Sequence, residues 1–157
     1  MIVKSYEINK IDFNKSKIVL FYGENNGLKK EKISEIINSN KEKTVLNYDE
    51  REILDKPEIL FDNIFSKSLF DKYKTITIKR VTDKIFKIIE KISESEIEDL
   101  LIILNSDNLE KKSKLRSLFE KSSKLFCIPC YPDNQQTLVR LANTFFKQKK
   151  ISISSII

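Results

Sequence analysis

Five short apolar runs, separated by segments with helical periodicity, are the feature that most restricts how this chain can fold. The runs cover residues 17–23, 43–49, 74–81, 99–106 and 125–131. The first and fourth are almost continuously hydrophobic, which is typical of strands covered on both faces of a parallel sheet. Because runs and helical segments alternate along the chain, the pattern predicts an α/β domain with a doubly wound, mostly parallel five-stranded sheet.

The segments between the runs place apolar residues on one helix face. Such spacing occurs in residues 27–39, in residues 109–122 and after Thr82, which is a candidate N-cap. Another helix is expected to start near Pro57. We expect four of its residues to form a core-facing stripe: Ile59, Leu60, Ile64 and Phe65.

The pattern changes after Pro132 and Asp133. Residues 134–149 predict a strongly amphipathic helix, and no convincing strand follows it. The apolar residues of that helix are Leu138, Leu141, Ala142, Phe145 and Phe146. The sequence therefore predicts an α/β domain over residues 1–132 and the beginning of a helical domain over residues 133–157.

Composition indicates a globular protein, since 33% of the residues are charged and 40% are hydrophobic. No apolar run approaches the roughly 18 residues of a membrane span, and the charged start lacks the apolar stretch of a signal peptide. We therefore expect a cytoplasmic protein without a membrane partner. The net charge is +6, but lysine and glutamate alternate along the chain. This favours solvated helix faces and indicates only weak or indirect contact with DNA.

The first apolar run leads into the place where a doubly wound domain would hold phosphates. A phosphate loop needs G-x-x-x-x-G-K-[ST], in which glycine amides surround the phosphates and the lysine pairs with them. Here Gly23 and Gly27 are one residue too close, and Leu28 and Lys29 stand where lysine and a hydroxyl residue are required. The loop is degenerate, and no nucleotide or other cofactor is expected.

The sequence also argues against a catalytic site. It has no histidine, so no histidine-based nucleophile pair can form. Lys79 and Arg80 end the third run where a nucleotide hydrolase would place an acidic metal ligand, and Asp49 and Glu50 are interpreted as solvated turn residues rather than a catalytic pair.

Two cysteines, Cys127 and Cys130, lie in the last apolar run. Because positions three apart in a strand point to opposite faces, we interpret them as buried structural residues. A metal site is not expected, since the chain has no histidine and no second cysteine pair.

Leu69 and Phe70 stand side by side where the predicted helix ends and the third strand begins. Two interpretations are open for this pair. It packs under the edge of the sheet and closes the helix end, or it is an exposed anchor for an apolar pocket on a partner.

Four segments together resemble one family. They are residues 18–37, 57–81, 100–120 and 127–133, and they are similar in order and spacing to the delta subunit of bacterial DNA polymerase III, in the style of its alphaproteobacterial members. The resemblance covers residues 17 to about 150. It implies a first domain related to AAA+ ATPases with a degenerate phosphate loop, and it identifies the helix from Asn134 as the start of a lid domain. It also places Asn105 where an ATPase relative keeps a phosphate-sensing residue, here without function.

The resemblance implies a function as well. The family's delta subunit binds the sliding clamp and helps to open it for loading on primed DNA. Its clamp-binding element is a Ser-Leu-Phe, which Ser68, Leu69 and Phe70 match in type and position. Other clamp-loader subunits would be further partners of a full-length protein. The collar domain of the family is missing here, so we expect clamp binding without stable loader assembly.

Two other classes of function stay open at this stage. One is a nucleotide-dependent phosphotransferase with a divergent loop. The other is a DNA-binding module that uses its lysines.

Overall fold

The computed structural model describes residues 1–13, 17–39, 43–66 and 73–151. Its strands are β1 (Ile18–Tyr22), β2 (Lys43–Asp49), β3 (Tyr73–Val81), β4 (Leu100–Ser106) and β5 (Phe126–Pro129). The α-helices are α1 (Asn26–Asn38), α2 (Glu50–Asp55), α3 (Pro57–Phe65), α4 (Phe86–Ser93), α5 (Lys114–Lys121) and α6 (Gln135–Gln148), and two 3-10 helices are η1 (Ser5–Lys10) and η2 (Asp83–Ile85).

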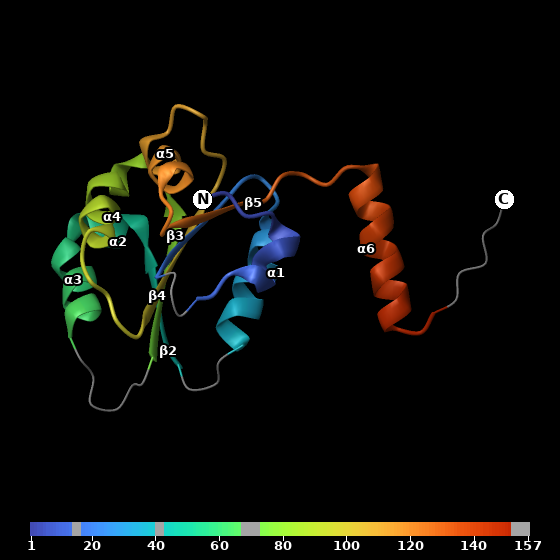
Figure 1. Ribbon diagram of the computed structural model, residues 1–157, viewed down its shortest axis with the longest axis horizontal. Helices are drawn as coiled ribbons and strands as arrows, with labels where there is room; N and C mark the ends of the chain where they lie inside the picture. The colour runs from blue at the N-terminus through green and yellow to red at the C-terminus, as the bar shows by residue number, and fades with distance from the viewer. Residues whose placement is uncertain (14–16, 40–42, 67–72, 152–157) are drawn as a thin grey trace.

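The five strands form one parallel sheet in the order β2-β3-β4-β1-β5. The almost continuous apolar runs became β1 and β4, which pair at the inside of the sheet, in register from Ile18 opposite Ile102 to Phe21 opposite Asn105. Helices cover both faces (Figure 1). The predicted doubly wound α/β architecture is therefore confirmed.

Successive side chains along each strand point to opposite faces of the sheet, and this divides the interior into two cores. On β1, Ile18, Leu20 and Tyr22 belong to the core under α2, α3, α4 and α5. Val19 and Phe21 point to the other face, toward α1 and η1. This strict division follows from the two-residue period of a strand. It explains why the central strands read as unbroken apolar runs.

Several predicted helix boundaries were wrong. The helix expected over 109–122 begins only at Lys114, since Ser113 is its N-cap and accepts a hydrogen bond from the backbone of Arg116. Thr82 is a cap as predicted, but it caps η2 by accepting from the backbone of Lys84. The α4 helix then starts at Phe86.

The first three residues extend the sheet beyond β5. Ile2 bridges Cys127, and the backbone of Val3 donates to the carbonyl of Cys127 (2.9 Å). The Met1 ammonium donates to the carbonyls of Phe119, Ser122 and Leu125 around the end of α5. A positive group at a helix C-terminus satisfies unpaired carbonyls there, so the chain start fixes this end of α5.

The amphipathic helix expected over 134–149 is confirmed as α6. Asn134 and Thr137 cap its start with a reciprocal pair of hydrogen bonds. All residues of α6 are described and none of them is buried. Figure 1 shows the helix standing apart from the sheet, on the far side of α1.

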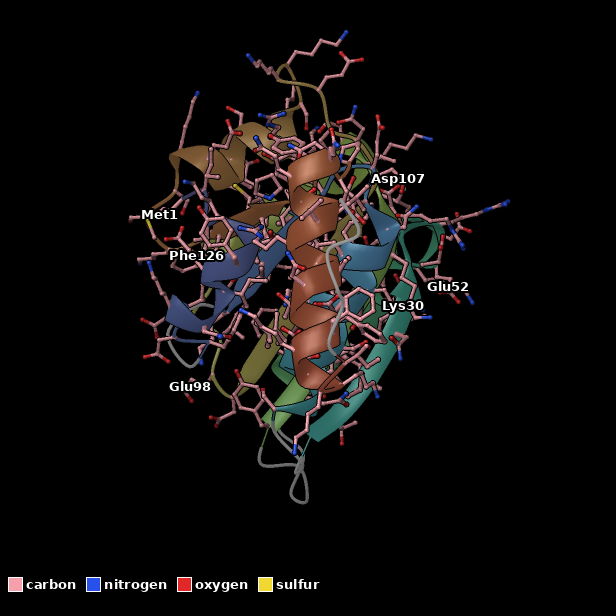
Figure 2. The ribbon with its side chains drawn as sticks, turned by 90° about the vertical axis from the view of Figure 1, so that its right-hand side faces the viewer. Met1, Lys30, Glu52, Glu98, Asp107 and Phe126 are labelled. Atoms are coloured by element: carbon pink, nitrogen blue, oxygen red, sulfur yellow. The ribbon has the colours of Figure 1, made fainter. Side chains whose placement is uncertain are left out.

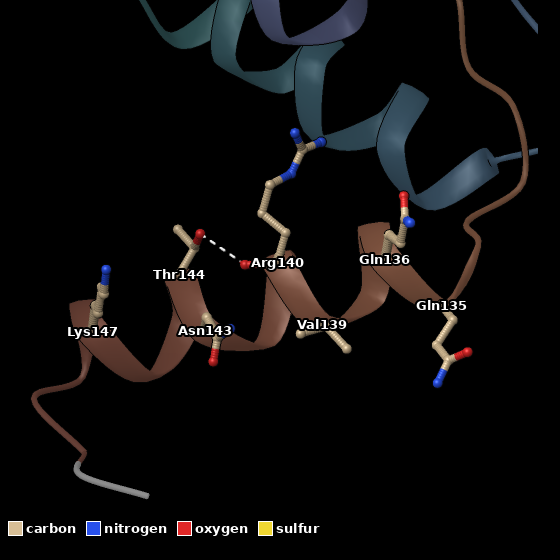
Figure 3. A pocket seen from close by; sticks show the side chains of 7 residues that line it. All are labelled: Gln135, Gln136, Val139, Arg140, Asn143, Thr144 and Lys147. Atoms are coloured by element: carbon tan, nitrogen blue, oxygen red, sulfur yellow. Dashed lines mark hydrogen bonds between the residues drawn. The ribbon is translucent and has the colours of Figure 1, made fainter.

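The side of α6 that faces the sheet domain is polar. Arg140 points from α6 toward the domain in Figure 3, and its guanidinium carbon lies 5.9 Å from the ring centroid of Tyr6. A groove of about 590 Å³ runs along α6, and its lining is mostly polar: Gln135, Gln136, Val139, Arg140, Asn143, Thr144 and Lys147. Leu138 and Phe145, in contrast, are 52% and 51% exposed. Thus the apolar stripe of α6 contributes nothing to either core.

This arrangement predicts that the sheet domain folds without α6. A chain that ends at Asp133 should have a free energy of unfolding within about 1 kcal/mol of that of the longer chain. The reason is that the contact that α6 makes through Arg140 is an exposed cation–π pair. Chemical denaturation followed by circular dichroism measures this. A loss of several kcal/mol would instead make α6 an integral part of the first domain and contradict the boundary near residue 132.

Candidate functional site

All strands of the parallel sheet begin at one edge, the amino edge, and end at the opposite edge, the carboxyl edge. Glu98 precedes β4 and Asp107 follows it, and Figure 2 shows these two residues at opposite ends of the molecule. In an open α/β sheet, ligands bind at the carboxyl ends of the strands. The predicted Ser-Leu-Phe element precedes β3 in the sequence, and β3 begins at the opposite, amino edge.

At the carboxyl edge, the loop after β1 approaches β5 closely. Gly23 has a φ of +119°, and a Cβ added there would overlap the carbonyl oxygen of Cys130. Its backbone N–H donates to the carbonyl of Asp107 (2.9 Å), and the N–H of Asn25 donates to that of Cys130 (3.0 Å). The loop therefore lies directly on the ends of β4 and β5.

Asn25 uses its whole side chain within the protein. Its Oδ1 accepts from the backbone of Leu28 (3.0 Å), which caps α1. Its Nδ2 donates to Asp133 Oδ2 (2.8 Å) and to the carbonyl of Tyr131 (3.3 Å). These bonds stabilise the closed loop, whereas a phosphate loop directs its amides at a ligand.

Lys29 is the most informative residue at this edge. It is 1% exposed. Its Nζ donates to the carbonyl of Ser106 (2.6 Å) and lies 3.5 Å from Asp107 Oδ1. A lysine that serves a nucleotide must reach its phosphates, but this ammonium is committed to the end of β4. The residues at the carboxyl edge thus do not fit a nucleotide.

Sequence reasoning noted that Lys29 is out of place but missed its buried role. The signal was available, because Lys29 lies four residues before Ile33 and seven before Ile36, and both isoleucines are buried on α1. A lysine at i, with apolar residues at i+4 and i+7, shares the core face of a helix. Asn105, the expected vestigial sensor, lies in β4 opposite Phe21 and Lys79.

The acidic residues after β2 have structural roles. Asp49 forms a capping box with Glu52 at the start of α2 and an ion pair with Arg80. Glu50 was interpreted as a solvated turn residue, which is wrong: it is buried and accepts from the backbone (2.6 Å) and the hydroxyl of Thr82. The carboxylate thereby links α2 to the end of β3.

Arg80 itself is exposed and has a φ of +55°, next to a register shift in β3. Its guanidinium pairs with Asp49, so a basic residue does stand at the end of this strand, as the sequence indicated. Within the described ranges, no group of three or more His, Cys, Asp or Glu residues could hold a metal ion.

The two cysteines are free and buried, as predicted, and they point into different cores. Cys127 belongs to the core under α5, and Cys130 belongs to the core beneath α1. Burial raises the pKa of each thiol to about 11. The thiolate is the reactive form, so neither cysteine is suited to redox exchange.

At the amino edge, the predicted element Ser68, Leu69 and Phe70 lies outside the described residues. The structure describes both flanks of this segment. On one side, α3 ends with the backbone of Ser66 donating to the carbonyl of Asp62 (2.8 Å). On the other, β3 begins at Tyr73.

The two flanks are fixed to each other. Lys74, in β3, donates from Nζ to the carbonyl of Asn63 (2.8 Å) and to that of Ser66 (3.5 Å). A cation at these carbonyls satisfies groups that the helix end leaves unpaired. Asn63 in turn donates from Nδ2 to the hydroxyl of Tyr48 (3.0 Å). The segment 67–72 therefore connects two ends that are held rigidly on the sheet.

The expected core-facing stripe of α3 is only half correct. Leu60 and Ile64 are buried, but Ile59 and Phe65 are 36% and 54% exposed. Residues four apart share a helix face, whereas each further residue turns by about 100°, so the flanking pair points outward. Phe65 consequently does not brace the helix against the sheet.

Phe65 instead stacks on Phe61 at the surface. The two rings are parallel with centroids 6.4 Å apart, and Lys91 Nζ lies 5.0 Å above the ring of Phe61. An aromatic pair with one exposed ring, Phe65, and one half-buried ring, Phe61, thus ends α3, and Phe65 lies three residues before the predicted element in the sequence. Paired apolar groups near such an element are typical of a surface that binds a partner.

The glycine at the carboxyl edge gives a first test. Gly23→Ala should lower the free energy of unfolding by at least about 2 kcal/mol, because a side chain at this φ is strained and overlaps Cys130. Gly27→Ala is the control. Its Cβ would meet Asn25 Oδ1 at an ordinary 3.6 Å, and we expect a change of less than about 1 kcal/mol. Equal effects in urea denaturation would contradict the close approach.

The thiols give a second test. In the unfolded chain they ionise near pH 9, but in the folded protein they stay protonated until about pH 11. Their contribution to stability is therefore complete below pH 9 and is lost between pH 9 and 11. A Cys127→Ala/Cys130→Ala variant should lose less stability over this interval than the parent. Iodoacetamide at pH 8 should modify the folded protein at least about tenfold more slowly than the unfolded one; rapid modification would argue against burial.

No helix in the described ranges combines the length and the apolar character that crossing a bilayer requires. No protein-family model and no curated protein matches the sequence. Among solved structures, the chain is similar to the DNA clamp loader delta protein of Bacillus subtilis, with a TM-score of 0.67 and 14% sequence identity. The match covers 95% of this chain and 48% of that protein, so this chain spans about half its length. At this identity, the comparison establishes a shared fold.

Proposed function

We propose that this chain binds a ring-shaped sliding clamp and helps to open it for loading on DNA, with Ser68, Leu69 and Phe70 as the contact. The observation that carries the proposal is the place of this tripeptide. It lies between two ends fixed by Lys74, in a fold shared with a clamp loader delta protein. A segment whose flanking residues are fixed binds a partner at a lower entropic cost than one attached to mobile ends.

The binding step is hydrophobic. Leu69 and Phe70 would enter an apolar pocket on the clamp, and burial of each side chain is worth roughly 1.5–3 kcal/mol. The stacked pair Phe61 and Phe65, of which Phe65 is exposed, ends the helix that precedes this segment and would add apolar surface at the margin of the contact. Lys91, over Phe61, adds a positive charge at the rim.

Opening of the ring follows from differential affinity. A surface that fits the open clamp better than the closed one shifts the population of the clamp toward opening. No nucleotide is consumed in this step, which agrees with the commitment of Lys29 to Ser106. ATP binding and hydrolysis would belong to neighbouring subunits of a loader, and those subunits would be further partners of this chain.

The same lysine argues against the phosphotransferase. That activity needs a cation free to meet the phosphates, and Lys29 is buried against a carbonyl. The proposed protein is therefore a non-catalytic subunit that acts through binding.

The test is the affinity for a bacterial sliding clamp, measured by surface plasmon resonance. Leu69→Ala/Phe70→Ala should weaken binding about 100-fold or more, since truncation of each hot-spot residue typically costs about 2 kcal/mol. The matched control is Leu138→Ala/Phe145→Ala, which removes the same side chains from the exposed stripe of α6.

Circular dichroism of both variants shows whether they fold. If the first variant folds and binds the clamp as tightly as the parent does, the assignment of the contact is wrong. If the parent itself shows no affinity for the clamp, the proposed function is wrong.

A further inference from the structure

The loop after β1 contacts the segment that leads from the sheet into α6. This connecting segment comprises residues 130–134, between the end of β5 and the first residue of α6. One residue of the loop, Asn25, forms hydrogen bonds with three residues of the segment. We propose that Asn25 fixes the direction of α6 relative to the sheet, so that the loop that does not fit a phosphate positions a helix instead.

The hydrogen bonds of Asn25 are spaced along the connecting segment. Its backbone N–H donates to the carbonyl of Cys130 (3.0 Å). Its Nδ2 donates to the carbonyl of Tyr131 (3.3 Å) and to Asp133 Oδ2 (2.8 Å). The bond to Asp133 is the shortest of the three and has a charged acceptor, and such bonds are stronger than those between neutral groups. We therefore expect Asp133 to contribute most to the contact.

Asn25 is itself fixed to the sheet domain. Its Oδ1 accepts from the backbone N–H of Leu28 (3.0 Å), in the first turn of α1. The side chain thus binds α1 through its oxygen and the connecting segment through its nitrogen. Earlier in the loop, the N–H of Gly23 donates to the carbonyl of Asp107 (2.9 Å). A donor that is already held in place binds at a low entropic cost.

The bond to Asp133 acts where α6 begins. The next residue, Asn134, caps α6 through a reciprocal pair of hydrogen bonds with Thr137. Since this cap joins Asn134 firmly to the first turn, a restraint on Asp133 reaches the helix within one residue of its start.

A second contact lies further along α6. The guanidinium carbon of Arg140 is 5.9 Å from the ring centroid of Tyr6, and Arg140 lies about 9 Å along the helix axis from Asn134. No residue of α6 is buried, so packing in the two cores does not set its direction. Two separated contacts define the direction of a helix, whereas the cation–π contact alone leaves its start free to move.

The simpler alternative is that Asn25 only caps α1. Asn25→Asp separates the two roles. A carboxylate at this position still accepts from the N–H of Leu28, but it cannot donate to the carbonyl of Tyr131, and it repels the carboxylate of Asp133. If the cap is the whole role of Asn25, this variant leaves α6 where it is.

The direction of α6 is measured by pulsed electron paramagnetic resonance between two nitroxide labels. The labels are attached at Lys87→Cys on α4 and Gln148→Cys at the end of α6, both of which are exposed positions. Cys127 and Cys130 are buried and stay unlabelled at neutral pH. The parent should give one narrow distance distribution, and Asn25→Asp should broaden it about twofold or more, since the restraint at the start of α6 is lost.

An exchange of the two side chains tests the contact itself. In Asn25→Asp/Asp133→Asn, the amide at position 133 can donate to the carboxylate at position 25, so most of the broadening should be reversed. Asn26→Asp is the matched control, because it adds the same charge to the next residue of the loop. The Asn26 side chain is exposed and forms no hydrogen bond within the described ranges, so the distribution should keep its parent width.

Asp133→Ala removes the acceptor without altering the cap of α1, and it should broaden the distribution as much as Asn25→Asp does. Far-ultraviolet circular dichroism shows whether each variant folds. A parent width in either of these variants, an exchange that leaves the distribution broad, or equal broadening in Asn26→Asp would overturn the proposal. The measurement does not involve the clamp or residues 67–72, so failure here leaves the proposed function untouched.

Discussion

The buried ammonium of Lys29 decides what this fold can do. Placing a charge out of water is costly unless strong hydrogen bonds replace its hydration, and the carbonyl of Ser106 provides such a bond. The bond ties α1 to the end of β4 where related folds keep a phosphate. Gly23 also lies against Cys130. The two contacts fill the edge of the sheet where a ligand would bind with contacts inside the protein.

The opposite edge of the sheet is where the strands begin. In a parallel sheet all strands start at the same edge, so the ends of helices that precede them gather there. Lys74 lies near the start of β3, and this position lets its ammonium donate to the carbonyls at the end of α3. A single side chain thereby holds the end of α3 against the start of β3.

The sequence predicted the sheet well, because burial on both faces produces the unbroken apolar runs of β1 and β4. It also predicted the opposite orientation of Cys127 and Cys130 from the strand period alone. Ends of helices were less predictable: Asp83 begins η2 and Ser113 precedes α5, and the contact between them at the start of α5 depends on tertiary structure. The same holds for Glu50, whose partner Thr82 lies far along the chain.

The candidate site shows the same division between local and tertiary information. The tripeptide Ser68-Leu69-Phe70 is a local pattern and could be recognised in the sequence. The contacts of Lys74 and Asn63 that fix its flanks could not be predicted, since they require the parallel pairing of β2 with β3 that brings Tyr48 beside α3. The outward position of Phe65 was missed because hydrophobicity alone does not say which flank of a short helix meets the core.

Electrostatics and hydrophobicity are segregated on this protein in a way that its net charge conceals. Lysines alternate with glutamates along the sequence, yet folding pairs Glu120 with Arg116 and sets Asp83 against backbone amides. Beside α5, Lys111, Lys114 and Lys121 form no ion pair within the described residues, although the Asp83 carboxylate lies at the first turn of the helix. The local charge of a surface is therefore set by which side chains pair after folding, and the order of charges along the sequence does not reveal it.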